Sequence, residues 1–368
     1  MNTYNKTALD YARMGADTLI RKFTTENLPP KNRFHYHQGV FLSGVERIYR
    51  LSREESYNKY IKAWLDLHID ENGKIRSDDN GRQFDDMQPA ILLFNLYSQT
   101  QDKRYKNLLD DFTQIVEMWP TNAMGGFWHM HSSPNQMWLD GLYMIGPYSV
   151  MYAHHFGKPY FYETIYQQMN LMRRNMTDQK TGLLYHAWDD SRMTDWSNKE
   201  TGLSAEFWGR AIGWYAVAIM DILDYIPEEH PRKQDFANAE RDIINALIRF
   251  QDKKTGMWFQ VVDKGDVEGN WIETSCSCLY TYAITKAMKK GLIHKSYYQH
   301  IRQAYEGIIN SLRFEGNDLI VTNVCIGTGV GDYQFYIDRP TVQNDLHGMG
   351  AFLLMCTEYY ETCKQLNL

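Results

Sequence analysis

Two consecutive segments, EFWGRAIGWYAVAIMDIL (206–223) and DFANAERDIINALIRF (235–250), carry the pattern that decides the fold. The first is apolar nearly all round, which is typical of a helix buried on every side. The second has apolar residues at helical spacing on one face and charged residues on the other, as in a helix at a surface. A buried helix beside an exposed one predicts two layers of helices, one inside the other.

The same alternation runs along the whole chain. Apolar spacing predicts twelve helices, of which the odd-numbered are amphipathic and the even-numbered are more uniformly apolar. No Pro/Gly/Ser-rich linker divides the 368 residues, so we predict an all-α fold, one (α/α)6 toroid over residues 1–368, with two side-by-side helical domains as the alternative. The predicted helices span about 4–24, 36–50, 53–68, a fourth from near Asp85, 103–118, a sixth that starts at Pro134 and contains Asp140, 158–175, 203–226, 232–252, 272–290, 294–313 and 343–366.

The connectors that lead from an outer to an inner helix also repeat. Segments 70–79, 178–190 and 252–264 share an Asp or Asn, a Gly and a short alternating run, and segments 125–131 and 316–324 occupy equivalent places. Such runs predict short β-hairpins at the rim of the toroid. The inner helices begin at that end, so their first turns should line a funnel. The residues in those positions are Tyr36, His37, Asp85, Asp86, His129, Asp140, His186, Trp208, Arg210, Trp214 and His347.

Composition excludes several function classes. The 26 Tyr and 10 Trp residues suit a large core and a pocket that stacks on sugar rings. A net charge of −6 without a long run of either sign argues against a nucleic acid or an anionic membrane as partner, and no apolar run approaches the length of a membrane span. The N-terminus lacks the apolar core of a secretory signal, and the five cysteines form neither an even framework nor a CxxC pair. A cytoplasmic protein with reduced thiols is therefore expected.

One acid, Asp140, lies within the apolar stretch GGFWHMHSSPNQMWLDGLYMIGPY (125–148). Pro134 stands where a helix can begin, which would put Asp140 inside that helix. An isolated carboxyl there is costly unless it is paired, protonated or used in catalysis. Burial would raise its pKa, which suits a general acid near neutral pH. A buried Asp bonded to a neighbouring turn is the alternative.

Two further carboxyls, Asp85 and Asp86, stand at the start of the fourth predicted helix in FDDMQPAILLF (84–94). One is expected to cap the helix, and the other to face the funnel, with the choice between them open. Paired acids such as Asp85 and Asp140 across a cavity suit glycoside chemistry. DDMQP is not the DDxxD motif of prenyl-chain cyclases, which disfavours a metal-diphosphate enzyme.

Arg210 lies between Trp208 and Trp214 in EFWGRAIGWY (206–215). An arginine among aromatic rings can stack on them and present its donors to a carboxylate, so Arg210 is a candidate anchor for an acidic sugar. A structural arginine bonded to an internal Asp is the alternative.

Metal binding and nucleophilic catalysis find less support. HYH (35–37) and HMH (129–131) could hold a metal ion, but no third ligand is evident, so contacts with sugar hydroxyls are preferred. A zinc site built on Cys276, Cys278 and a histidine would match no common spacing. GTGVGD (327–332) is not GxGxxG, and we predict an irregular rim loop that no helix follows. The absence of a GxSxG elbow argues against a Ser-His-Asp hydrolase.

Six motifs together resemble a known family: FDDMQPA, GGFWH, SPNQMWLDGLYMIGPY, EFWGRAIGWY, GTGVGDYQFYIDRP and NDLHGMGAFLLM. They are similar to those of the unsaturated rhamnogalacturonyl hydrolases, glycoside hydrolase family 105, which are relatives of the unsaturated glucuronyl hydrolases. The resemblance covers about residues 8–365. It implies the same six-hairpin toroid, the cytoplasmic location of many members, and neither a metal nor another cofactor.

The resemblance also implies a reaction. The substrate would be an oligosaccharide left by a polysaccharide lyase, with a C4=C5 double bond in its terminal uronic acid. The enzyme would protonate this vinyl ether at C4, water would add at C5, and the unstable product would release the neighbouring sugar. By motif, Asp140 is the general acid and also activates the water, while Asp85 is the second acid, which holds sugar hydroxyls or assists. The matching substrate-binding positions are Tyr36, His129, His186, Trp208, Arg210 and Trp214.

The leaving sugar stays open at this stage. The unsaturated rhamnogalacturonan disaccharide from pectin is expected first, but the HMHSS turn (129–133) does not match the family's rhamnose-reading segment position by position. The alternatives are an unsaturated glucuronyl hydrolase with another leaving sugar, an ordinary glycosidase or sugar epimerase on the same toroid, and a non-catalytic sugar-binding protein. A monomer and a homodimer are both compatible with the sequence.

Overall fold

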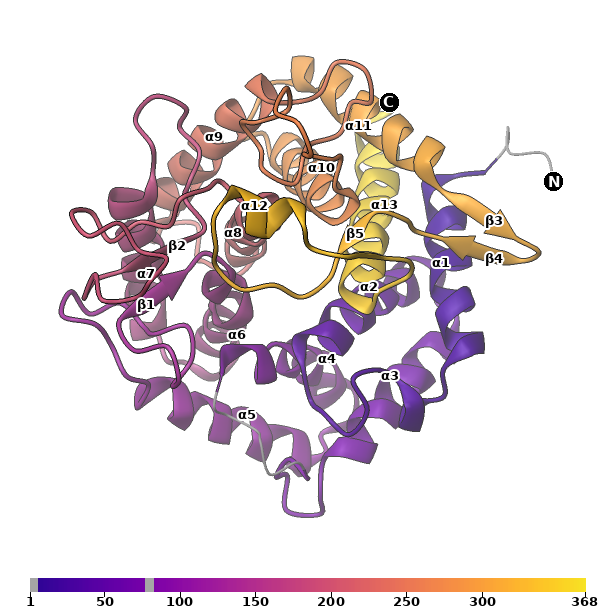
Figure 1. Cartoon of the computed structure of the whole chain (residues 1–368). Helices are drawn as coiled ribbons and strands as arrows, with labels where there is room; N and C mark the ends of the chain where they lie inside the picture. Colours follow the sequence, from indigo (N-terminus) through magenta and orange to yellow (C-terminus); the bar gives the residue numbers. More distant parts are fainter. Residues whose placement is uncertain (1–5, 77–82) are drawn as a thin grey trace.

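The computed structural model describes residues 6–76 and 83–368, and its helices form a closed double ring (Figure 1). Outer and inner helices alternate along the chain, which confirms the six-hairpin toroid. The outer helices are α1 (Ala8–Lys22), α3 (Glu55–His68), α5 (Lys103–Glu117), α7 (Tyr160–Met176), α9 (Lys233–Arg249) and α11 (Tyr298–Ser311). The inner helices are α2 (Tyr36–Ser52), α4 (Ile91–Thr100), α6 (Asp140–Phe156), α8 (Gly209–Ile222), α10 (Thr274–Lys289) and α13 (Leu346–Leu366).

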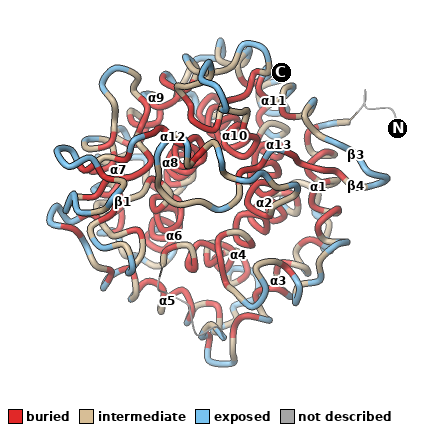
Figure 2. Tube along the Cα trace, viewed as in Figure 1, coloured by how far each residue is buried: buried red, intermediate tan, exposed pale blue. Residues whose placement is uncertain are grey.

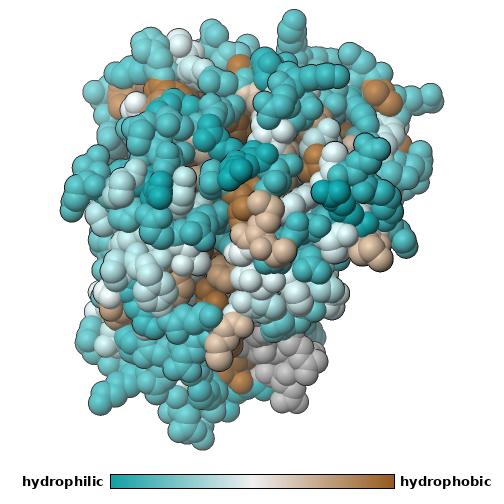
Figure 3. Space-filling model, turned by 90° about the vertical axis from the view of Figure 1, so that its left-hand side faces the viewer, coloured by the Kyte–Doolittle hydropathy of each residue, from teal (hydrophilic) through white to brown (hydrophobic). Residues whose placement is uncertain are grey.

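The two rings differ in burial as their sequences predict (Figure 2). Every residue of α8 except Asp221 is buried, whereas α9 buries one face that includes Phe236, Ile243 and Leu247. The last inner helix, α13, packs against both α2 and α10 and so closes the ring. The face of the molecule drawn in Figure 3 is mainly hydrophilic, with small hydrophobic areas between the hydrophilic ones. Among the described residues, no helix combines the length and apolarity that crossing a bilayer requires.

Three inner helices, α4, α6 and α8, begin about six residues later than the sequence predicts, and α8 starts at Gly209 rather than near residue 203. Helix α4 starts at Ile91 rather than near Asp85, because the preceding residues form two 3₁₀ turns (Phe84–Asp86 and Gln88–Ala90) around Pro89. Proline disfavours the helical conformation of the residue before it.

Helix α6 starts at Asp140, not at Pro134. The residues before it form strand β1 (Gln136–Trp138), which pairs with β2 (Ala187–Asp189) from the next connector. This long-range pairing overrides the local helical pattern, and it places Asp140 at the first residue of the helix rather than inside it.

The predicted rim hairpins are only partly present in the described residues. Strands β3 (Arg313–Glu315) and β4 (Asp318–Ile320) form a hairpin. By contrast, β1–β2 pairs two different connectors, and β5 (Val324–Cys325) pairs with β6 (Thr341–Val342) across a long loop. Connector 70–79 contributes the bridge Ile69–Ile75, and connector 178–190 contributes the bridges Thr177–Leu184 and Trp188–Leu203 besides β2. Residues 77–79 lie outside the described residues.

The prediction that no helix follows GTGVGD (327–332) is wrong. The short helix α12 (Tyr333–Ile337) begins directly after it, capped by the Asp332 carboxylate, which accepts from the Phe335 N–H at 2.9 Å. The Tyr336 side chain is fully buried and attaches this helix to the toroid. The loop therefore lies at the rim as predicted, but it is held at its far end.

Ion pairs, some of them buried, surround a second cavity at the end of the ring where the inner helices finish. Lys286 on α10 is 2% exposed, and its Nζ lies 2.6 Å from carboxylate oxygens of both Asp221 and Asp224. Arg47 on α2 lies 3.0 Å from the fully buried Glu358 on α13. These charges join several inner helices at one end, and the opposite end is left for the pocket.

Replacement of Lys286 by Met is expected to lower the free energy of unfolding by about 1–3 kcal/mol, because Asp221 and the exposed Asp224 lose one charged partner but keep Arg47 and Lys290. Urea denaturation at pH 7 measures the change. Lys253→Met, which removes an exposed lysine from a loop, should change stability by no more than about 0.5 kcal/mol. Equal losses in the two variants would contradict a stabilising role for the buried pairs.

Candidate active site

A pocket of ≈ 860 Å³ opens where the inner helices begin. It contains six of the eight predicted site residues, Tyr36, Asp85, His129, Asp140, Trp208 and Arg210. The other residues that line it are His35, His37, Met130, Trp138, Met144, Gly327, Thr328 and Gly329. The helix starts therefore converge on one cavity, as the toroid predicts.

Asp140 is the first residue of α6 and contacts a buried histidine. One carboxylate oxygen lies 3.2 Å from Nε2 of His186, whose Nδ1 is 2.7 Å from the Tyr336 hydroxyl. Burial raises the pKa of Asp140, but the hydrogen bond and charge of His186, with that of His129, outweigh burial and bring the pKa below its ordinary value. The prediction that burial gives Asp140 a raised pKa is therefore wrong, because the sequence does not show that His186 lies beside it.

Asp85 is the carboxyl of the FDD turn that faces the pocket. Burial, the charge of Asp140 and the charge of Asp86 raise the pKa of Asp85 to about 8, against the opposing charge of Arg33. Asp86 instead lies 2.9 Å from an Arg33 guanidinium nitrogen, which settles the choice that the sequence leaves open. Near neutral pH, Asp85 thus holds a proton and Asp140 is ionised. Two carboxyls whose surroundings separate their pKa values in this way can divide acid and base roles.

Aromatic rings form the apolar walls of the pocket. The His129 ring stacks on Trp138, with ring centroids 4.4 Å apart and planes at 15°. Burial lowers the pKa of His129 to about 4, so this ring is neutral near pH 7. Trp208 lies nearly parallel to Tyr336 at 5.9 Å. Flat apolar faces of this kind suit the carbon face of a sugar ring.

Arg210 combines a structural role with a place in the pocket wall. Its guanidinium lies 4.5 Å from the centre of the Trp208 ring. Nη1 donates to the carbonyl oxygen of Cys325 at 2.7 Å, and Nη2 donates to that of Ile326 at 2.8 Å. The bonds go to backbone carbonyls rather than to the internal Asp of the alternative reading. Arg210 therefore holds the chain just before the rim loop 327–329, and its charge stands beside the cavity.

Two predicted substrate-binding residues are not among those that line the pocket. Trp214 is 1% exposed and stacks on Tyr143 at 4.7 Å, behind Tyr36. His186 is fully buried behind Asp140. Both support the wall of the pocket from behind.

Sequence reasoning missed several pocket residues. Trp138 ends strand β1, two residues before Asp140. In an extended segment, residues two apart lie on the same side, so a predicted strand would have placed Trp138 beside Asp140. The helix predicted over this segment hid that relation. Gly327 and Gly329 arrive from a loop almost 190 residues further along the chain, for which no local signal exists.

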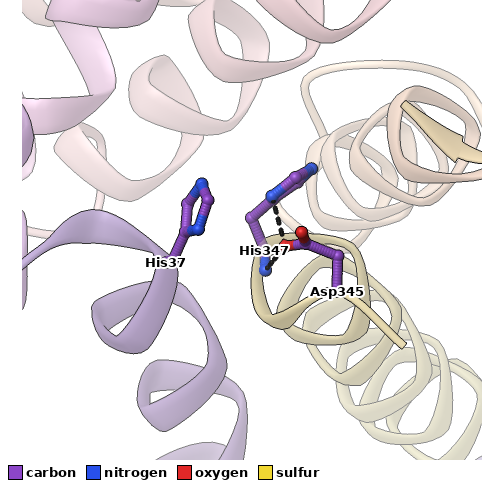
Figure 4. Close-up of side chains that lie close together, drawn as sticks. All are labelled: His37, Asp345 and His347. Carbon is purple, nitrogen blue, oxygen red and sulfur yellow. Dashed lines mark hydrogen bonds and ion pairs between the residues drawn. The ribbon is translucent and has the colours of Figure 1, made fainter. Parts of the chain in front are cut away.

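Metal-ligand side chains also lie close to the pocket. Among the described residues, the group that could hold an ion consists of His37, Asp345 and His347, whose ligand atoms all lie within 4.8 Å of one another (Figure 4). Of the HYH motif only His37 belongs to this group, and the two other ligands, which the sequence did not show, come from the start of α13. Cys276 and Cys278 are free and buried, and neither belongs to this group.

Comparisons with known proteins identify the family and agree with the fold. Residues 11–363 match the sequence profile of Glycosyl Hydrolase Family 88. The chain is 26% identical over 335 residues to the unsaturated rhamnogalacturonyl hydrolase YesR of Bacillus subtilis, covering 89% of this chain and 90% of that protein. The structure resembles a glycoside hydrolase from family 105 of C. acetobutylicum (TM-score 0.90, 31% identity, 95% and 99% of the two chains). It shares its fold with the unsaturated glucuronyl hydrolase of Bacillus sp. GL1 (TM-score 0.71, 11% identity, 95% of each chain).

Proposed function

This chain belongs to Glycosyl Hydrolase Family 88, and from that premise we propose that it removes the terminal 4,5-unsaturated uronic acid from oligosaccharides made by a polysaccharide lyase. The observation that carries the proposal is that two carboxyls, Asp85 and Asp140, line one pocket, where their surroundings raise the pKa of Asp85 and lower that of Asp140. The name of the relative YesR, an unsaturated rhamnogalacturonyl hydrolase, supports the same substrate class.

The reaction begins with proton transfer to carbon. Asp140, once it has taken over the proton that Asp85 holds in the free protein, gives it to C4 of the vinyl ether, and positive charge develops at C5 and the ring oxygen. Water adds to C5 while its proton passes to a carboxylate, so the pair regains the proton that it gave. The resulting hemiketal opens to a ketone at C5, and the hemiacetal left at C1 then expels the neighbouring sugar. The sum is the addition of one water and the release of one sugar.

The two carboxyls share the work of this reaction. Asp140 acts at the double bond, since it lies at a helix start in the pocket with His186 and Tyr336 behind it. Asp85 keeps the proton of the pair in the free protein, because its pKa is about 8. Coupled carboxyls are best described by the proton count of the pair. The pair therefore enters the reaction with one proton, which Asp140 alone would not retain near neutral pH.

The other pocket residues position the sugar. Trp138 and Trp208 offer flat faces, and the neutral His129 offers a ring nitrogen for a hydroxyl. The charge of Arg210 favours an anionic sugar, although its terminal nitrogens already donate to two carbonyls. Within the substrate class we favour the unsaturated rhamnogalacturonan disaccharide, and Met130 of the HMHSS turn would contact the leaving sugar. A cytoplasmic location belongs to the same proposal and is consistent with the five free thiols.

Loss of the ultraviolet absorbance of the conjugated double bond tests this function. The purified protein is incubated separately with lyase digests of rhamnogalacturonan and of glycosaminoglycans, and the absorbance is followed. We expect the signal to fall in at least the first digest, with release of one saturated sugar per double bond lost. An ordinary glycosidase or an epimerase would act on saturated sugars and leave the absorbance unchanged. A sugar-binding protein would show saturable binding without turnover of any digest, and either result would contradict the proposal.

A further inference from the structure

Three side chains beside the pocket have no part in the reaction proposed above. His37 is the second residue of α2, Asp345 caps α13, and His347 is the second residue of α13. Figure 4 shows His37 facing Asp345 and His347 from the opposite helix start. Their ligand atoms lie within 4.8 Å of one another, although residues 37 and 345 are far apart in the sequence.

The hydrogen bonds of His347 require a positive charge next to its ring. The ring is fully buried, and its Nε2 lies 3.1 Å from the carbonyl oxygen of Cys325. A carbonyl only accepts, so Nε2 carries a proton. Nδ1 lies 2.6 Å from a carboxylate oxygen of Asp345, which is also an acceptor. A neutral ring would place two lone pairs against each other, so either a second proton or a metal ion must lie between these atoms.

The position of His37 favours the metal ion. A proton would join only His347 and Asp345, whereas an ion could also bind His37, whose ring centroid is 4.9 Å from that of His347 and whose Nε2 lies 2.9 Å from the Tyr36 hydroxyl. Two imidazoles and one carboxylate are a ligand set that divalent transition ions prefer. A metal-bound histidine usually donates its other N–H to a carbonyl or carboxylate, which is the bond that His347 makes to Cys325.

We propose that His37, Asp345 and His347 bind a divalent transition-metal ion such as zinc, with a coordination position open toward the pocket. His37 itself lines the pocket. A Cβ placed on Gly327 would lie 3.9 Å from Nε2 of His37, an ordinary contact distance, so the rim loop passes directly beside this ring. Tetrahedral zinc holds its ligand atoms about 3.4 Å apart. Binding would thus widen the Asp345–His347 contact and draw His37 inward, by rotation of side chains.

The open position would take a carboxylate oxygen of the sugar, a step that rests on the proposed function. The terminal nitrogens of Arg210 donate to the carbonyls of Cys325 and Ile326. A metal ion in the same wall would be a second cation for the uronate carboxylate. Unlike Arg210, it would not also donate hydrogen bonds to backbone carbonyls.

Zinc titration of the metal-stripped, tag-free full-length chain tests the site. Isothermal calorimetry at pH 7 is expected to show one tightly bound ion per chain. Asp345→Asn and His37→Gln should each weaken binding by at least the roughly 10- to 100-fold that loss of a second-shell partner costs. Asn still caps α13, and circular dichroism with a thermal melt verifies that both variants are folded. His154→Gln removes an exposed histidine elsewhere and should leave zinc binding unchanged.

Two outcomes would overturn the proposal. Absence of zinc binding, or binding that neither variant weakens, would show that a proton rather than a metal ion lies between Asp345 and His347. We expect galacturonate to bind more tightly to the zinc-loaded protein than to the zinc-free protein. Equal affinities would show that the ion has no open coordination position toward the pocket. Zinc titration needs no turnover, so a negative absorbance assay would contradict the proposed function but not the ion site. Absence of zinc binding would likewise contradict the ion site but not the proposed function.

Discussion

Asp140→Asn is expected to lower the turnover of an unsaturated uronyl disaccharide by about 10³-fold or more at every pH between 5 and 9, since one residue would serve as both acid and base. Asn has the shape of Asp and retains an oxygen that can face His186, so the pocket keeps its form. It cannot deliver a proton to C4 or take one from water. We therefore expect binding to stay within a few-fold of the original, while the chemical step is lost.

Two measurements separate these effects. Decay of the double-bond absorbance gives the turnover rate, and calorimetric titration with the disaccharide gives the affinity of the inactive variant. Asp195→Asn, which changes an exposed carboxylate in the loop after β2, serves as the matched control and should keep full activity. If Asp140→Asn retained more than about a tenth of the turnover, Asp140 would not act at the double bond.

The fold follows from the sequence because burial pattern is a property of each helix alone. The contrast between α8, buried almost throughout, and α9, buried on one face, is readable in the residues of each segment. The boundaries of α4 and α6 are not readable in this way. The start of α6 depends on the pairing of Trp138 with Ala187 in β1–β2, and no local pattern shows a partner about 50 residues away.

The same distinction between local and long-range information applies to the site. Asp85, Asp140 and Arg210 are predictable, since charged groups in apolar helices stand out in the sequence. Their electrostatic states are not predictable, because these depend on neighbours from other segments. His186 brings the pKa of Asp140 down, and carbonyls near residue 325 occupy the Arg210 guanidinium. The third member of the histidine cluster, Asp345, is hidden for the same reason.

Asp85→Asn is expected to change the pH dependence of turnover as well as its size. In the unaltered chain the raised pKa of Asp85, about 8, keeps the proton on the pair throughout the neutral range. Turnover should therefore be flat below pH 7 and fall about tenfold per pH unit above pH 8. In the variant the proton has only Asp140, whose pKa lies below its ordinary value. Turnover at pH 7 should fall by about 10²- to 10⁴-fold, and it should rise about tenfold per unit as the pH is lowered toward 5.

The shape of the profile distinguishes the proton-holding role from a structural one. Asn at position 85 matches the shape of the neutral carboxyl that the folded protein already contains, so the pocket should persist, as a thermal melt can verify. A variant that merely loosened the pocket would lose activity by the same factor at every pH and would keep its alkaline limb near 8. Values of kcat/KM measured from pH 5 to 9 distinguish the two cases. The control Asp195→Asn should keep the decrease in activity above pH 8. A limb near 8 that survives in Asp85→Asn would mean that another group holds the proton, because the carboxyl that titrates there would no longer exist.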